Sequence, residues 1–179
     1  NAYRIFKTQL GENHLKTITA KYNADVLYCY QSNYEKCLPL LEEDIERFER
    51  LPEAPPQFLA WAYTNYGSFA IDVGDPEKAV IYLNKAAQLY SKTNGPFYSS
   101  NAAQLYSYLA IAEEKNGNIS DALHLHLKAF QLVQPLVPST HPTLIDIQGN
   151  VAHTYTKLQM PDSALCFLLP AIKNLSKNL

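Results

Sequence analysis

Apolar side chains recur at the three- and four-residue spacing of amphipathic helices through most of this chain of 179 residues. Gly, Asn and Pro interrupt the pattern at short turns, and no segment alternates apolar and polar residues for long enough to predict a β-strand. The pattern therefore predicts an all-α fold of helices joined in pairs, at 15–30 and 34–51, 58–73 and 77–90, 101–115 and 121–133, and 143–158 and 162–175.

Turn, cap and breaker residues mark the expected ends of these helices. Gly74 and Gly117 follow the first helices of two pairs, where glycine readily adopts the left-handed conformation that ends a helix. Ser120 is the expected N-cap of the helix that follows Gly117. Pro39 and Pro170 fall inside predicted helices, and we expect them to bend those helices.

The four predicted pairs are related by a constant period. The first small position after each turn is Cys37, Ala79, Ala122 and Ala164, at spacings of 42, 43 and 42 residues. A second small position follows seven residues later in each pair, at Asp44, Ala86, Ala129 and Ala171. Small residues locked to such a period indicate a helical repeat protein, because each pair must stack on its neighbours to bury its apolar face.

We expect the repeats to form one domain over 1–179, with repeats at 15–51, 58–92, 101–134 and 143–176. Proline-rich connectors at 52–56 and 135–142 and a break at 94–96 separate the pairs. Residues 1–14 are predicted to be an N-terminal cap or the tail of a preceding helix.

The second pair carries the residues of a known family. The pattern resembles the tetratricopeptide repeat (TPR), in the residues Tyr63, Tyr66, Gly67, Gly74, Asp75, Ala79, Leu83 and Ala86. The usual period of about 34 residues is lengthened here, as in the TPR regions of kinesin light chains and bacterial regulators, to which segment 139–152 is also similar. The resemblance implies a right-handed superhelical α-α solenoid of about four TPR-like helix pairs.

The resemblance also implies a concave groove lined by the first helix of each pair, in which a peptide or partner protein binds. The positions carried over are Thr19, Tyr22, Asn23 and Val26; Trp61, Thr64, Asn65 and Ser68; Gln104, Ser107, Tyr108 and Ile111; and Asp146, Gly149, Asn150 and His153. One column, Asn23, Asn65, Tyr108 and Asn150, resembles the asparagine ladder with which such domains hold a peptide backbone. The alternative is that these asparagines bond an adjacent helix or cap locally.

Two further groups near the groove have alternative interpretations. Trp61 is either a groove anchor or packs on the preceding pair. Lys21, Lys115 and Lys157 lie near the groove face, but they do not form the full basic clamp that holds a peptide carboxylate in some relatives of the family.

Charge and cysteine content narrow the classes of partner and compartment. The net charge is −2 and no basic run occurs, so the footprint of a nucleic-acid binder is missing. The charged residues between Glu42 and Arg50 are expected to form a solvated helix face with i,i+4 ion pairs.

Cys29, Cys37 and Cys166 are odd in number, which argues against a disulfide framework and favours a reducing compartment such as the cytoplasm, with export still open. No membrane span or signal-peptide pattern is expected in this segment.

The titratable residues do not predict an active site. His124 and His126 point away from each other on a helix and so cannot share a metal, while His14, His141 and His153 are scattered. No nucleophile has a placeable base, and no glycine loop for phosphate is present. We therefore predict a non-enzymatic protein with no cofactor and no metal.

The sequence favours an interaction module that binds a protein or peptide in a concave groove, as the repeat region of a larger bacterial signalling or regulatory protein. The alternative is a structural solenoid that associates with itself and has no dedicated peptide groove. A helical-repeat enzyme is a third possibility, and it would require a deep pocket with perturbed titratable groups. The last predicted helix keeps Leu168, Leu169, Ile172 and Leu175 apolar, which suggests that something covers it.

Overall fold

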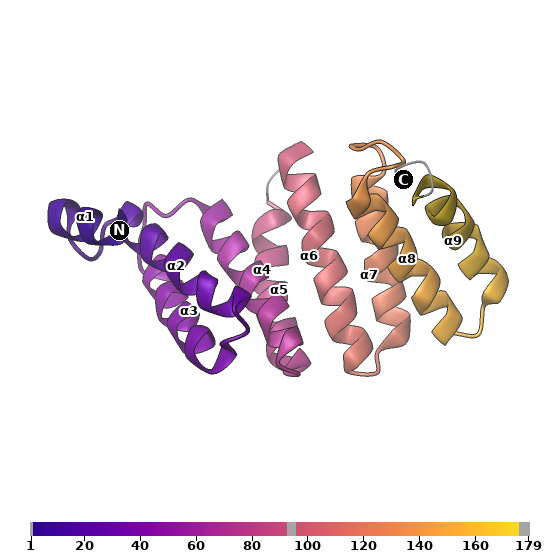
Figure 1. Cartoon of the computed structure of the whole chain (residues 1–179), viewed down its shortest axis with the longest axis horizontal. Coiled ribbons are helices and arrows are strands. Elements are labelled where there is room, and N and C mark those ends of the chain that lie inside the picture. Colours follow the sequence, from indigo (N-terminus) through magenta and orange to yellow (C-terminus); the bar gives the residue numbers. More distant parts are fainter. Residues whose placement is uncertain (1, 93–95, 176–179) are drawn as a thin grey trace. The chain divides into compact units, whose positions relative to one another are not determined.

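The computed structural model describes residues 2–92 and 96–175, and every regular element in these ranges is an α-helix (Figure 1). The helices are α1 Ala2–Leu10, α2 Leu15–Tyr30, α3 Tyr34–Glu49, α4 Pro56–Asp72, α5 Pro76–Tyr90, α6 Pro96–Lys115, α7 Ile119–Val133, α8 Pro142–Lys157 and α9 Pro161–Leu175. The chain falls into two compact units, Asn1–Leu89 and Tyr90–Leu179. None of the described helices is both long and apolar enough to cross a lipid bilayer.

Within each unit the helices pack in chain order as the pairing predicts. In the first unit α2 packs on α3, which in turn packs on α4, while α1 packs on α2. In the second unit α7 lies between α6 and α8, and α9 packs on α8. The grouping of all repeats into one domain stays a prediction.

The predicted helix ends are right at most turns and wrong at three starts. Helices α4 and α6 begin at Pro56 and Pro96, earlier than expected, because proline is well suited to the first helical position, where its missing N–H has no partner to lose. Helix α7 begins at Ile119 with Asn118 at its N-cap, so Ser120 lies inside the helix instead of capping it. Most of the predicted break at 94–96 lies outside the described residues.

The left-handed turn position recurs in all four pairs, even where the glycine is replaced. Gly74 and Gly117 have φ angles of 83° and 86°, and Ser32 and Gln159 occupy the equivalent positions, each with a φ of 58°. A side chain in this region costs about 1–2 kcal/mol, because its Cβ crowds the following carbonyl oxygen. The first and fourth pairs therefore carry a local strain that the second and third avoid.

Replacing Ser32 or Gln159 by glycine is expected to raise the free energy of unfolding by roughly 0.5–1 kcal/mol, the relief of this strain less the entropy that glycine adds to the unfolded chain. Thermal and urea unfolding followed by circular dichroism measure the change. The control is Gln131→Gly at an exposed position inside α7, where glycine should instead cost roughly 0.5–1 kcal/mol. A loss of stability at the turn positions would show that they are unstrained.

The small positions of the repeat are where the paired helices touch. All eight residues at the two periodic small positions are buried, from Cys37 in the first pair to Ala171 in the last. Gly67 marks a close contact between α4 and α5, since a Cβ at this position would lie 2.5 Å from Cγ of Leu83. The predicted periodicity thus corresponds to the contact line between helices.

Two of the cysteines form a disulfide, which corrects the prediction made from their number. Cys29 lies in the last turn of α2 and Cys37 in the first turn of α3, and the connection between the helices brings their Cα atoms to 5.4 Å. Both are buried, while Cys166 is free and exposed. A single bond across one turn needs no framework of paired cysteines, so the odd count did not exclude it, and the argument for a reducing compartment falls.

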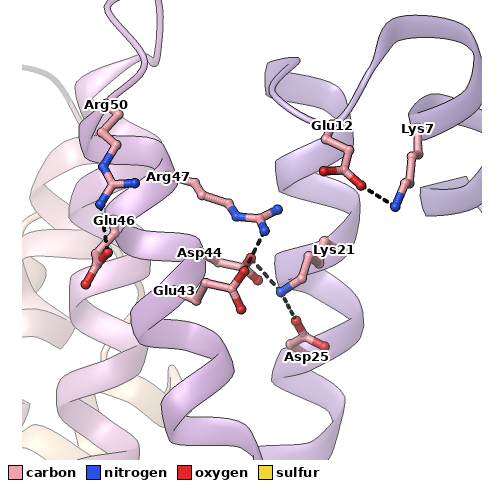
Figure 2. A network of polar contacts seen from close by, with 9 residues as sticks. All are labelled: Lys7, Glu12, Lys21, Asp25, Glu43, Asp44, Glu46, Arg47 and Arg50. Carbon is pink, nitrogen blue, oxygen red and sulfur yellow. Dashed lines mark hydrogen bonds and ion pairs between the residues drawn. The ribbon is translucent and has the colours of Figure 1, made fainter.

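The predicted solvated face of α3 is also wrong at Asp44, which is 0% exposed. Lys21 on α2 lies between two carboxylates, with Nζ 2.7 Å from Asp44 Oδ1 and 2.8 Å from Asp25 Oδ2 (Figure 2). Burial lowers the pKa of Lys21, but its hydrogen bonds to the two carboxylates outweigh burial and raise it overall. For the carboxyl group of Asp44 burial has the opposite effect and raises the pKa, although the nearby ammonium group of Lys21 lowers it.

The rest of that α3 face is partly as predicted. Arg47 pairs with Glu43 and Arg50 pairs with Glu46, each at i,i+4 (Figure 2). Glu42 instead accepts a hydrogen bond from the hydroxyl of Tyr66 on α4 at 2.8 Å. It therefore joins α3 to the next pair.

A candidate peptide-binding cleft

A cleft of about 310 Å³ opens between α6 and α8 in the second unit. These are the first helices of the third and fourth pairs, whose faces were predicted to line a groove. The lining residues are Ser100, Gln104, Ser107, Tyr108 and Ile111 from α6 and Thr143, Asp146, Ile147 and Asn150 from α8. Their spacing of three and four residues puts each set on one helix face, so the cleft follows directly from the helical period.

Six of the residues predicted for the groove therefore meet in this cleft, namely Gln104, Ser107, Tyr108, Ile111, Asp146 and Asn150. Two others from the fourth pair, Gly149 and His153, are not among its lining residues. The ring of His153 is mostly exposed, with Nε2 3.5 Å from the carboxylate of Glu114 on α6. Three lining residues that the groove positions did not include are Ser100, Thr143 and Ile147, which lie beside predicted ones on the same helix faces.

The polar side chains of the cleft form hydrogen bonds with one another but keep further donors and acceptors available for a ligand. Gln104 Nε2 donates to the Tyr108 hydroxyl at 3.2 Å, and Asn150 Nδ2 donates across the cleft to Ser107 Oγ at 3.4 Å. A primary amide has two N–H donors and one carbonyl acceptor, so each of these bonds uses only one donor of its amide. The cleft can therefore offer both donors and acceptors to a polypeptide backbone.

The remaining lining residues set the charge and polarity of the cleft. Ile111 and Ile147 provide apolar surface. Asp146 is exposed and is the only carboxylate among the lining residues, which include no Lys, Arg or His. A cationic group of a ligand would therefore meet one negative charge and no competing positive one.

Asn150 makes a hydrogen bond of the kind that the alternative interpretation describes. Its Nδ2 donates to Ser107 Oγ on the first helix of the preceding pair at 3.4 Å, and the residue itself is half-buried. Tyr22, the residue equivalent to Ser107 in the repeat, donates from its hydroxyl to the Ala62 carbonyl at 3.4 Å. Burial raises the pKa of Tyr22, and the Asn65 amide opposes the shift.

In the first unit several predicted groove residues belong to the core, which corrects their assignment. Tyr22 is fully buried, and Thr64 and Val26 are also buried. The Thr64 hydroxyl donates to the Ala60 carbonyl of its own helix at 2.8 Å. The ring of Tyr22 packs against the rings of Phe48 and Trp61, whereas the equivalent Ser107 of the second unit lines the cleft.

The other predicted residues of the first unit lie nearer the surface. Asn23 is exposed, and Thr19 and Ser68 are half-buried. Trp61 is half-buried and packs edge-on against Tyr22, with ring centroids 4.9 Å apart, so it contacts the preceding pair as one of its two interpretations proposed.

Two of the three lysines near the groove face, Lys21 and Lys157, are engaged elsewhere. Lys21 is held by Asp25 and Asp44, and Lys157 Nζ lies 2.5 Å from Glu114 Oε1. Neither ammonium group lines the cleft. In the part of the chain that the structure describes, no group of three His, Cys, Asp or Glu side chains is placed to hold a metal ion.

Comparison with solved structures establishes the class of fold. The chain is similar to BtubC from P. vanneervenii, with a TM-score of 0.79 and 17% identity over 99% of this chain and 69% of that one. It is also similar to a structure of nearly identical TPR-like repeats from Podosopora anserina, with a TM-score of 0.76 and 19% identity over 98% and 83% of the two chains. The apo form of RapI gives a TM-score of 0.80 and 15% identity, over 98% and 47%.

These likenesses show that the chain has a TPR-like helical-repeat fold, of the all-α solenoid class that the sequence predicts. No protein-family model matches the chain. Among curated proteins, the "Clustered mitochondria protein homolog" of Brugia malayi is 33% identical over 101 residues, which is 56% of this chain. The match spans 7% of the length of that relative.

Proposed function

We propose that the α6–α8 cleft binds an extended segment of a partner protein, and that the chain is an interaction module without catalytic activity. The observation that carries this proposal is that α6 and α8, the first helices of neighbouring pairs, present amide and hydroxyl groups beside an apolar surface in one cleft. Such groups suit a peptide backbone, which presents alternating donors and acceptors along its length. The mostly uncharged lining of the cleft supports binding of a polypeptide backbone more than catalysis.

The charge of the cleft supports a finer proposal about the bound segment. Asp146 has no cation beside it among the lining residues, so a Lys or Arg side chain of the segment would gain a charge-assisted hydrogen bond there. The backbone contacts themselves do not depend on the sequence of the segment. We therefore expect a ligand with one basic residue and few other requirements.

Selection from a random linear peptide library displayed on phage tests both points. We expect wild-type protein to enrich peptides that share a Lys or Arg, and the double variant Gln104→Ala with Asn150→Ala to bind them at least tenfold more weakly, through loss of two amide contacts worth about 1 kcal/mol each. The matched control, Gln131→Ala on the exposed surface of α7, should bind as wild type does. Unchanged binding by the double variant would overturn the proposed site.

The variant Asp146→Asn separates the charge from the backbone contacts. It should remove the preference for a basic residue while neutral peptides of the same length keep their affinity. Equal preference in wild type and Asp146→Asn would contradict the role of this carboxylate without affecting the rest of the cleft.

The wider placement of the module is a separate proposal. The sequence resembles bacterial regulators, whereas the curated relative comes from Brugia malayi and is far longer than this chain. We propose that the chain serves as a repeat module within a larger protein, and the bacterial signalling role stays a prediction. Reading the genomic frame around this segment tests it.

A further inference from the structure

Helix α9 carries an apolar row on its solvent side. The α9 outer face consists of Leu165, Leu168, Leu169, Ile172 and Leu175, which are between 39% and 60% exposed. The opposite side of the helix is used inside the unit, since Ala164 and Ala171 are buried and the Phe167 ring packs against the rings of Phe130 and Tyr155. Single exposed apolar residues are common on proteins, but a continuous row at helical spacing marks an interaction surface.

The internal repeat indicates what fits this row. The residues 42 positions earlier, on α7, are Leu123, His126, Leu127, Phe130 and Val133. All of them are buried or half-buried, and α7 is packed between α6 and α8 (Figure 1). The second helix of the first pair, α3, is likewise followed by a packed helix, α4. In both cases the second helix of a pair, α3 or α7, is covered by the first helix of the following pair, α4 or α8.

The occupants α4 and α8 share a recognisable chemistry. Each begins with a proline, and α8 places Leu144, Ile147 and Val151 in the buried interior, at spacings of three and four residues. A helix with this apolar stripe is complementary to a row of leucine and isoleucine side chains, because ridges of apolar side chains pack into the grooves of a facing helix.

We infer that the α9 outer face is a docking surface for an amphipathic helix of a partner protein, in the position that α8 takes on α7. The α9 outer face includes none of the residues that line the α6–α8 cleft, and the inference goes beyond the proposed peptide binding. Burial of several leucine and isoleucine side chains supplies its driving force, and the partner is defined by a stripe of apolar residues at i, i+3 and i+7.

A labelled synthetic peptide of residues 142–157, the chain's own α8, is the probe for this surface. We expect fluorescence anisotropy to show saturable binding to the full chain. The double variant Leu169→Lys with Ile172→Lys should weaken it at least tenfold, because each ammonium would have to be desolvated. The matched control is Leu27→Lys with Ile81→Lys, two similarly exposed apolar positions of the first unit, which should leave the affinity unchanged.

Two further measurements complete the test. A peptide with Leu144, Ile147 and Val151 replaced by Ser should not bind, and circular dichroism should show the same melting for both double variants, since all four sites are exposed. No saturable binding, or equal binding to wild type and the Leu169→Lys, Ile172→Lys variant, would overturn the inference. So would a dimer in light scattering that this variant dissociates, because a second copy would then be the occupant. Cleft-selected peptides should bind the same variant normally, so failure of one proposal is distinguishable from failure of the other.

Discussion

Replacing Lys21 by Met is expected to lower the free energy of unfolding of the first unit by about 3–5 kcal/mol, the usual cost of removing one partner from a buried ion pair. The ammonium group of Lys21 is the cation held between Asp25 and Asp44, and both carboxylates are buried. Asp44 Oδ2 already has no hydrogen-bond partner, so loss of Lys21 leaves the whole carboxylate unpaired. Trp61, the only tryptophan, packs on Tyr22 in the same unit, so its fluorescence during urea unfolding reports on this unit.

The repeat supplies the control for this prediction. The three later pairs have Ala where the first has Asp44. A triple variant, Lys21→Met with Asp25→Ala and Asp44→Ala, removes every charge of the network and should return to within about 1 kcal/mol of wild type, because a buried ion pair gives little net stability over apolar packing. If Lys21→Met alone costs less than about 1 kcal/mol, well under the usual cost for a buried pair, the network is not buried in solution as it is here.

The second unit is expected to lose about 2 kcal/mol of stability between pH 7.5 and pH 5 through His126 alone. This imidazole is 1% exposed, and its Nδ1 has no hydrogen-bond partner. Burial lowers the pKa of His126 from 6.5 to about 4, with Glu114 opposing the shift and His153 adding to it. His126 of the unfolded chain therefore binds a proton near pH 6.5, whereas His126 of the folded chain stays neutral until the pH approaches 4. The contribution of the neutral imidazole to the free energy of unfolding is complete above pH 6.5 and declines as the pH falls towards 4.

Unfolding of His126→Leu and wild type across this pH range measures the effect by difference. Subtracting the two curves removes the titration of carboxylates and of the other histidines, which both proteins share. His124→Gln, an exposed neighbour on the same helix, should follow the wild-type curve. Parallel curves for wild type and His126→Leu would show that His126 is hydrated or bonded in solution.

Local rules predicted the helices and their pairing because both depend on neighbours in the chain. The small residues from Cys37 to Ala171 are buried at both periodic positions of every pair, and the left-handed turn position persists at Ser32 and Gln159 without its glycine. Starts were missed at Pro56 and Pro96, where a proline that usually breaks helices begins one.

The errors that matter for chemistry came from contacts between elements. The disulfide of Cys29 and the burial of Asp44 depend on how α2 and α3 face each other, and a count of cysteines or a run of charges does not contain that information. The same applies to the candidate site. The helical period located one face of each first helix, but it does not show that Tyr22 on that face is buried in the first unit while the equivalent Ser107 lines a cleft in the second.

The central claim is that the α6–α8 cleft is the binding site, and a nuclear magnetic resonance titration tests it most directly. Uniformly ¹⁵N-labelled protein would be titrated with a library-selected peptide while the side-chain amide signals of Gln104 and Asn150 are followed. We predict that these two signals and the backbone amides of Ser107, Tyr108 and Asp146 shift most. Shifts confined to α9 or to the first unit, with both side-chain amides unmoved, would contradict the claim.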